Sequence, residues 1–196
     1  MLINITGIDG CGKSLQITLL EGHIRSKGKG VFISKAYGKA EKDIFSAYVE
    51  TIEQEALLFL FQAFHVRQFL KAREALEKGD IVIADRWDES YIVYHSQRGI
   101  LAHDPMLREK LNKLAFKSVI PDFTFLLDVS VEVGQHRTYA RGADFFDKKP
   151  ADYHEMMRRG YLSLAQERRW YVLDGNKNVE TLHKEVADIV EPVLGA

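Results

Sequence analysis

Short, almost wholly apolar segments alternate along the chain with longer segments whose apolar residues recur at helical spacing. The apolar segments lie at residues 2–6, 31–34, 81–84, 123–127 and 171–173. Helical patterns cover residues 15–27, 53–78, 88–99, 131–141 and 179–190. One further helix begins at 105, and another, after the polar segment at 142–150, ends near 168. Strands that are apolar on both faces are typical of a parallel sheet covered by helices. The pattern therefore predicts an α/β fold with a five-stranded parallel sheet.

Two polar segments interrupt this alternation. Residues 39–48 have no clear period, and residues 142–150 have few apolar anchors. No repeat or linker divides the chain, whose 196 residues match the size of one domain. We expect a single domain over 1–196, with the segment at about 142–151 forming a small mobile lid.

Composition narrows the class of protein. Lys and Arg number 27 against 28 Asp and Glu, so a chain-wide basic surface for nucleic acid is not expected. The longest apolar run, residues 56–61, is far shorter than the ~18 residues of a membrane span, so no membrane partner is expected. The lone cysteine, Cys11, excludes an internal disulfide, and no basic, signal-like N-terminus is visible. A reducing, cytoplasmic setting fits best.

A glycine-rich segment at residues 7–14 carries the strongest chemical signal. It reads Gly-Ile-Asp-Gly-Cys-Gly-Lys-Ser, between the first apolar segment and the first helical one. This matches the phosphate-loop pattern, in which backbone N–H groups and a helix N-terminus surround phosphate oxygens. We expect Lys13 to contact the terminal phosphates of ATP and Ser14 to ligate Mg²⁺. The rest of the ATP site is expected at Gly7, Asp9, Gly10, Cys11, Gly12 and Leu15. For Cys11, a simple role as a small turn residue is the alternative.

A carboxylate and a guanidinium follow the third apolar segment. Asp85 and Arg86 come directly after residues 81–84. At the carboxyl end of a central strand, Asp85 can order Mg²⁺ or its waters, and Arg86 can bind a second phosphate bidentately. Alternatively, Asp85 caps the next helix and pairs with Arg86. A guanine-specific GTPase is not favoured, because residues 176–179 place a valine where the guanine-reading aspartate belongs.

These motifs resemble those of the thymidylate kinase family over nearly the whole chain, in the same order. The resemblance covers the phosphate loop with Asp9 at its third position, the Asp-Arg-Trp at 85–87, the Pro-Asp-x-Thr strand at 121–129, and the lid. It implies a three-layer α/β/α P-loop fold and a homodimer. It also implies acceptor contacts from Asp9, Arg86, Ser90 and Tyr94.

Two departures from the family pattern affect the acceptor side. Residues 35–40 replace the usual Arg-x-Pro-Gly-Gly-Thr. The resemblance makes Phe61 the ring that stacks on the base, but the position of the base-reading arginine is taken by His65. Both are expected to bind substrate, with core packing as the alternative. A neutral imidazole offers one donor and one acceptor, so we expect a base preference broader than strict use of dTMP.

The lid is expected to supply the transition-state cations. The family places an arginine either in the phosphate loop, where this chain has Gly10, or in the lid. Arg137 and Arg141 are four residues apart on one predicted helix, so both can face the transferred phosphoryl group. Lys148 and Lys149 can close over the site. Alternatively, the two arginines and the two lysines are simply solvated surface residues.

The acceptor itself is expected to be a nucleoside monophosphate. A nucleoside hydroxyl needs a carboxylate base near the second strand, and residues 35–40 contain none. We therefore expect ATP-dependent phosphorylation of a small nucleotide, dTMP by resemblance. The alternatives are a kinase for another monophosphate or a deoxynucleoside, and a nucleotide-binding ATPase or sensor without transfer.

Overall fold

Five parallel strands form one sheet at the centre of the molecule. The computed structural model describes all residues except 36–37, 50, 98–99, 141, 143–145 and 195–196. The strands are β1 (Leu2–Thr6), β2 (Val31–Lys35), β3 (Ile81–Asp85), β4 (Phe123–Asp128) and β5 (Tyr171–Asp174). Their order is β2-β3-β1-β4-β5, and every pairing is parallel.

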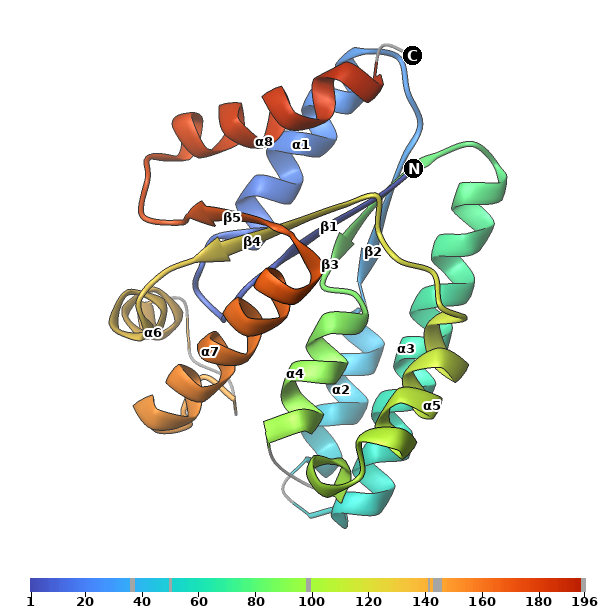
Figure 1. The fold of residues 1–196 in the computed structure, drawn as a ribbon, viewed down its shortest axis with the longest axis vertical. Coiled ribbons are helices and arrows are strands. Elements are labelled where there is room, and N and C mark those ends of the chain that lie inside the picture. Colours follow the sequence, from blue (N-terminus) through green and yellow to red (C-terminus); the bar gives the residue numbers. More distant parts are fainter. Residues whose placement is uncertain (36–37, 50, 98–99, 141, 143–145, 195–196) are drawn as a thin grey trace.

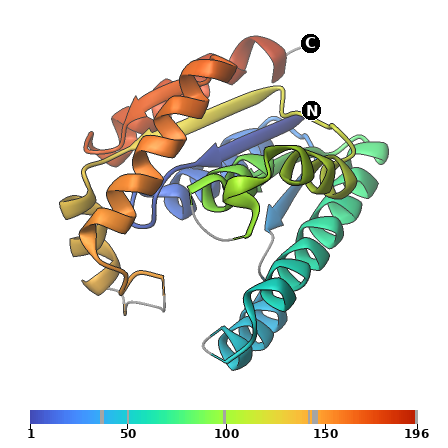
Figure 2. The same ribbon diagram turned by 60° about the horizontal axis from the view of Figure 1, so that its bottom comes forward.

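Helices cover both faces of this sheet. They are α1 (Lys13–Ser26), α2 (Lys39–Tyr48), α3 (Gln54–Glu77), α4 (Asp88–Gln97), α5 (Pro105–Phe116), α6 (Val131–Ala140), α7 (Ala151–Arg168) and α8 (Val179–Leu194). A short 3₁₀ helix, Ile100–His103, precedes α5. Helices α1 and α8 lie together on one side, and α3, α4, α5 and α7 lie on the other (Figure 1). Figure 2 shows α2 beside the first half of the long α3. The predicted three-layer α/β/α fold is confirmed.

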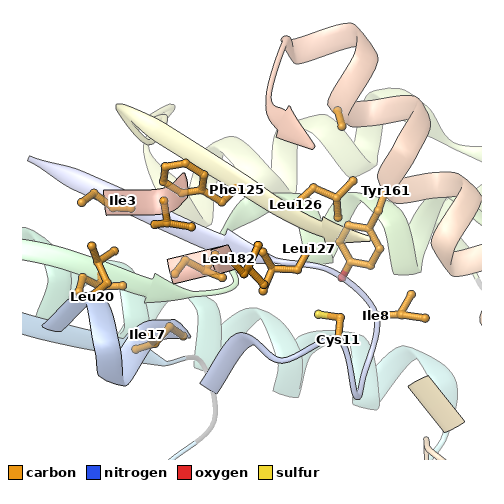
Figure 3. Packing of buried hydrophobic residues seen from close by; sticks show 14 of the residues in the cluster. Ile3, Ile8, Cys11, Ile17, Leu20, Phe125, Leu126, Leu127, Tyr161 and Leu182 are labelled. Atoms are coloured by element: carbon orange, nitrogen blue, oxygen red, sulfur yellow. The ribbon is translucent and has the colours of Figure 1, made fainter. Parts of the chain in front are cut away.

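Alternate apolar residues of β1 and β3 belong to two separate core clusters, as the period-two geometry of a strand requires. Ile3 and Ile5 of β1 belong to the same buried cluster as Leu20 of α1 and Leu182 of α8, and Figure 3 shows Ile3, Leu20 and Leu182. Leu2 of the same strand belongs to a second cluster with α3 and α5. Because both faces are covered, this strand is buried throughout, its polar residues Asn4 and Thr6 included.

Two expectations from the pattern differ from the structure. The ambiguous segment 39–48 forms α2. Strand β5 was expected to be buried, but Tyr171 is 43% and Val172 is 48% exposed. The reason is its place at the sheet edge, where it pairs with β4. Within the described part of the chain, no helix is long and apolar enough to cross a membrane.

The strand order brings the predicted site residues together. In the register of β1 with β3, Ile5 lies opposite Asp85, so the phosphate loop after β1 begins beside the Asp85–Arg86 pair. Strand order reverses at β1, with β3 on one side and β4 on the other. Ligands of open parallel sheets bind at such a point, beyond the carboxyl ends of the strands.

Candidate active site

The phosphate loop has the predicted strand–loop–helix form. Gly7, Gly10 and Gly12 have φ angles of 137°, 79° and 103°, which side chains rarely tolerate. Lys13 opens α1 and turns back into the loop, where its Nζ donates hydrogen bonds to the carbonyls of Gly7 and Ile8, at 3.2 and 3.0 Å. The loop therefore already holds an ammonium group at its centre, the position from which it can reach a bound phosphate.

The other predicted donor-side residues divide by exposure. Ser14 and Leu15 lie on the exposed surface of the first turn of α1, with Leu15 48% exposed. Cys11 is 1% exposed, and its Sγ lies 3.8 Å from the Nζ of Lys13. The burial of Cys11 in the core cluster fits its alternative role as a small turn residue (Figure 3).

The phosphate loop touches helix α6 through two glycines. A Cβ on Gly10 would lie 2.2 Å from the carbonyl oxygen of Gly134, and a Cβ on Gly134 would lie 2.8 Å from that of Asp9. The loop has no room for a side chain at position 10 unless α6 moves away. A transition-state cation at position 10 is therefore excluded while α6 stays in place, and its supply from the lid stays a prediction.

Arg137 follows Gly134 by one turn of α6 and contacts the backbone around the loop. One Nη donates to the carbonyls of Gly10 and Gly175, at 3.3 and 3.2 Å. Its guanidinium thus joins the loop to the segment after β5. Arg141, its predicted partner, lies outside the described residues. A role for either in phosphoryl transfer stays a prediction.

Arg86 lies at the centre of the predicted acceptor side. Its guanidinium donates to the Asp9 carboxylate at 2.8 Å and to the hydroxyls of Ser90, at 3.4 Å, and Tyr161. Ser90 and Tyr161 are themselves hydrogen-bonded at 2.8 Å. The hydroxyl of Tyr161 points from α7 toward the phosphate loop (Figure 3). The phosphate loop, the Asp-Arg-Trp motif and α7 therefore all contact the Arg86 guanidinium.

Two phenol rings line this guanidinium. Its central carbon lies 6.0 Å from the ring centre of Tyr94 and 5.6 Å from that of Tyr161, within cation–π range. Burial raises the pKa of both phenols above the usual range, so both stay neutral at physiological pH. Asp9 is then the anion nearest to Arg86, and a phosphate is a chemically equivalent partner.

The predicted base-binding residues occupy different environments. His65 is 4% exposed, with its ring centre 5.8 Å from that of Tyr91 and 5.3 Å from that of Phe116. Burial lowers its pKa to about 4, so it is neutral at physiological pH. Phe61 is partly exposed and has His95 edge-on at 6.3 Å. The surroundings of His65 favour the packing alternative, whereas those of Phe61 leave stacking as a prediction.

Comparisons with known proteins agree with this geometry. A sequence profile of the family described as Thymidylate kinase matches residues 5–186. The chain belongs to the thymidylate kinase family. The thymidylate kinase of Thermosipho melanesiensis is 32% identical, with 99% of each chain covered. Those of Thermoanaerobacter sp. and Nitratidesulfovibrio vulgaris are 29% and 32% identical, with 98% and 100% of this chain and 98% and 94% of theirs covered.

The donor set for Mg²⁺ in this thymidylate kinase-family chain is small. Asp85 lies at the carboxyl end of β3, with its carboxylate 3.7 Å from the Lys35 ammonium, and Ser14 supplies a hydroxyl. Across the described residues, no three His, Cys, Asp or Glu side chains gather as for a tight metal site. One hydroxyl and one carboxylate fit Mg²⁺, which is held mainly by substrate phosphates and water in kinases.

The described part of the lid leads into a helix that is tied to the sheet. Lys148 is exposed and Lys149 half-buried, in a turn that precedes α7. About two turns after this helix begins, Arg158 binds the Asp128 carboxylate at the end of β4 bidentately, at 2.7 and 2.8 Å. Since this pair joins the middle of α7 to the end of β4, the helix that carries Tyr161 is anchored beside the phosphate loop.

Sequence reasoning missed four residues that contact predicted site residues. Tyr161 contacts Arg86, Gln68 and Glu89 hold the backbone next to it, and His95 faces Phe61. Glu89 carried a usable signal, because a carboxylate in the first turn of a helix often binds backbone N–H groups. Gln68 carried none, since a lone glutamine on a long helix has no distinguishing spacing.

Proposed function

We propose that this chain transfers the γ-phosphoryl group of ATP to dTMP, giving ADP and dTDP. Family membership supports the reaction class, and curated relatives across nearly the full length bear the name thymidylate kinase. The observation that carries the proposal is the 2.8 Å contact between Arg86 and Asp9. It brings a cation suited to an acceptor phosphate directly to the loop suited to ATP.

On the donor side, the loop amides and Lys13 bind the β- and γ-phosphates of ATP. Ser14 and Asp85 hold Mg²⁺ or its waters, and the ion neutralises phosphate charge when bound. The Lys13 ammonium leaves the carbonyls of Gly7 and Ile8 to meet the phosphate. These residues position and stabilise charge, which is most of what phosphoryl transfer requires.

On the acceptor side, Arg86 binds the phosphate of dTMP. Asp9 and Tyr161, its present partners, are replaced in part by phosphate oxygens, which accept two parallel hydrogen bonds from the guanidinium. The monophosphate oxygen is already ionised, so it attacks without a general base. Ser90 and Tyr94 complete this end, and Phe61 stacks on the base.

Two arginines that precede the lid complete the stabilisation of the transition state. We assign this role to Arg137 and Arg141, in a single domain over 1–196 whose lid covers about 142–151. Arg137 already contacts the loop carbonyl of Gly10. Closure would bring these cations over the phosphates and exclude water.

The setting that we propose is the cytoplasm, with a homodimer as the assembly. Cys11, the chain's one cysteine, is a free thiol, as a reducing compartment allows. Exposed apolar side chains on α3 and α5, including Phe59, Met106 and Leu114, are suited to a second copy. Light scattering during gel filtration would measure the mass, and a monomer at micromolar concentration would refute the dimer.

A coupled assay of ADP release tests the function. ATP and Mg²⁺ are supplied with each deoxy- and ribonucleoside monophosphate in turn, and with thymidine. The highest kcat/KM is expected for dTMP, with at least one other monophosphate within about a hundredfold. The reason is that the base-reading arginine and the usual residues at 35–40 are both replaced in this chain. Steady ADP release without acceptor would favour an ATPase, and preference for thymidine would favour a nucleoside kinase.

A further inference from the structure

The main chain at Arg86 adopts an uncommon conformation. Its φ is 69°, in the left-handed region, where a side chain costs about 1–2 kcal/mol. Such a conformation persists only when surrounding contacts impose it, and these contacts are often found at functional sites. Here it ends β3 and turns the long Arg86 side chain toward Asp9.

Hydrogen bonds hold this residue from both sides. The Arg86 N–H donates to the carbonyl of Ile5 in β1 at 3.2 Å. The Arg86 carbonyl accepts from Nε2 of Gln68 in α3 at 2.9 Å. The next N–H, that of Trp87, donates to both carboxylate oxygens of Glu89, at 3.0 and 2.9 Å. Both peptide groups that flank the Arg86 Cα are therefore fixed, and two of the three backbone groups involved are held by side chains.

Both side chains lie in the interior. Gln68 is 2% exposed and Glu89 is fully buried. Asn4 of β1 donates to Glu89 at 3.0 Å, and the Ser90 hydroxyl donates at 3.3 Å. Burial raises the pKa of Glu89, so an ionised carboxylate is costly here. A buried carboxyl group that touches no expected ligand needs another reason to be present.

We infer that Gln68 and Glu89 are positioning residues for the acceptor phosphate, because they hold Arg86 in the left-handed conformation that aims its guanidinium at the phosphate loop. The inference rests on the proposed function, in which Arg86 binds the phosphate of dTMP. Neither residue touches the ATP loop in the described contacts. Their loss should therefore weaken use of dTMP and leave binding of ATP nearly unchanged.

The Gln68→Met variant tests this role against a matched control. It keeps the volume of the side chain and removes the donor to the Arg86 carbonyl. Gln16→Met is the control, since Gln16 is also 2% exposed and also donates from Nε2 to a backbone carbonyl, that of Val179, at 3.2 Å. We expect Gln68→Met to raise the KM for dTMP about tenfold with the KM for ATP unchanged, as for a small displacement of a positioning group. Gln16→Met should change neither.

Glu89 is tested by rescue. Glu89→Met removes the acceptor for the Trp87 N–H and should raise the KM for dTMP. Glu89→Gln keeps one oxygen for that N–H, and Asn4 can turn its amide to accept from the new N–H₂ group. We expect Glu89→Gln to recover most of the affinity for dTMP that Glu89→Met loses. If Gln68→Met fails to fold, Gln68→Asn replaces it, because its shorter amide cannot reach the Arg86 carbonyl. If Glu89→Met fails to fold, the Gln68 variants alone test the positioning role.

A second measurement is independent of turnover. The side-chain ¹⁵N–¹H signal of Arg86 in the ligand-free protein, assigned with Arg86→Lys, should shift in Gln68→Met and stay in place in Gln16→Met. An unmoved signal, or an equal rise in the KM for dTMP in both glutamine variants, would overturn the positioning role. A wild-type protein that does not phosphorylate dTMP would refute the proposed function alone, and the signal would still decide the positioning role.

Discussion

The ATP side and the acceptor side of this site differ in whether backbone or side-chain groups make their contacts. Around the phosphate loop, the contacts are made mainly by backbone: glycine against glycine, and the Lys13 ammonium against carbonyl oxygens. Around Arg86, they are made by side chains from several elements, among them Asp9, Gln68, Glu89 and Tyr161.

This difference decides how each side responds to change. A backbone-built site depends on the absence of side chains and on a short run of residues adjacent in sequence. A side-chain-built site depends on residues that are far apart in sequence and brought together by folding. The donor side should therefore fail abruptly on substitution, and the acceptor side should weaken by steps.

Removal of the loop cation is expected to give the largest effect. Lys13→Ala should lower kcat by about a thousandfold or more, since charge stabilisation carries most of phosphoryl transfer. Loss of its bonds to two loop carbonyls should cost only about 1 kcal/mol of stability. Steady-state kinetics and thermal melts check both, with Lys177→Ala on the exposed surface as the control. Full activity in Lys13→Ala would refute the assigned donor site.

A methyl group between the loop and α6 should have the next largest effect. Gly134→Ala places its Cβ 2.8 Å from the Asp9 carbonyl, so loop and helix must separate, at a cost of about 2 kcal/mol. Gly22→Ala is the matched control, because Gly22 is also helical and a Cβ there meets nothing within 4 Å. This control should gain about 0.5–1 kcal/mol from helix propensity. Denaturant unfolding measures both, and equal gains would show that the contact is not tight.

A conservative change at the guanidinium should weaken the acceptor side by a smaller step. Arg86→Lys keeps the charge and loses the fork that binds a phosphate bidentately. We expect the KM for dTMP to rise roughly tenfold, about 1.4 kcal/mol, with the KM for ATP little changed. Initial rates over a grid of both substrates separate the two constants. An equal loss for both would give Arg86 a structural role on both sides.

The smallest effect expected at neutral pH concerns His65. Its pKa is about 4 in the folded chain against 6.5 for an unperturbed histidine, so the unfolded state binds more protons between these values. The free energy of unfolding should therefore fall by up to about 3 kcal/mol as pH falls from 6.5 to 4. His65→Phe should remove this loss and flatten the pH profile of the thermal midpoint. His136→Phe, at an exposed site, serves as control, and identical profiles in wild type and His65→Phe would contradict the assignment.

The two sides also differ in how far the sequence predicts them. The loop at 7–14 is one contiguous motif, so its form and neighbours followed from spacing and from the strand before it. The fold followed likewise, because buried parallel strands are apolar on both faces. Gln68 was missed, since its partner Arg86 lies on another element and only tertiary contact reveals the pair. Glu89 was missed although its place in the first turn of α4 signals a bond to a nearby backbone N–H. The exposure of β5 was missed because the apolar content of a segment does not reveal whether its strand lies at the edge of the sheet.

The contact between Gly10 and Gly134 constrains how this chain can change by descent. An arginine cannot enter position 10 while Gly134 presses on it, whereas the retreat of α6 would withdraw the Arg137 bond to Gly10. Substitutions at the two positions are therefore coupled, because a change at either one alone disturbs the contact between the loop and α6. A lineage that moves its cation from lid to loop must therefore alter the helix before the loop, or both together.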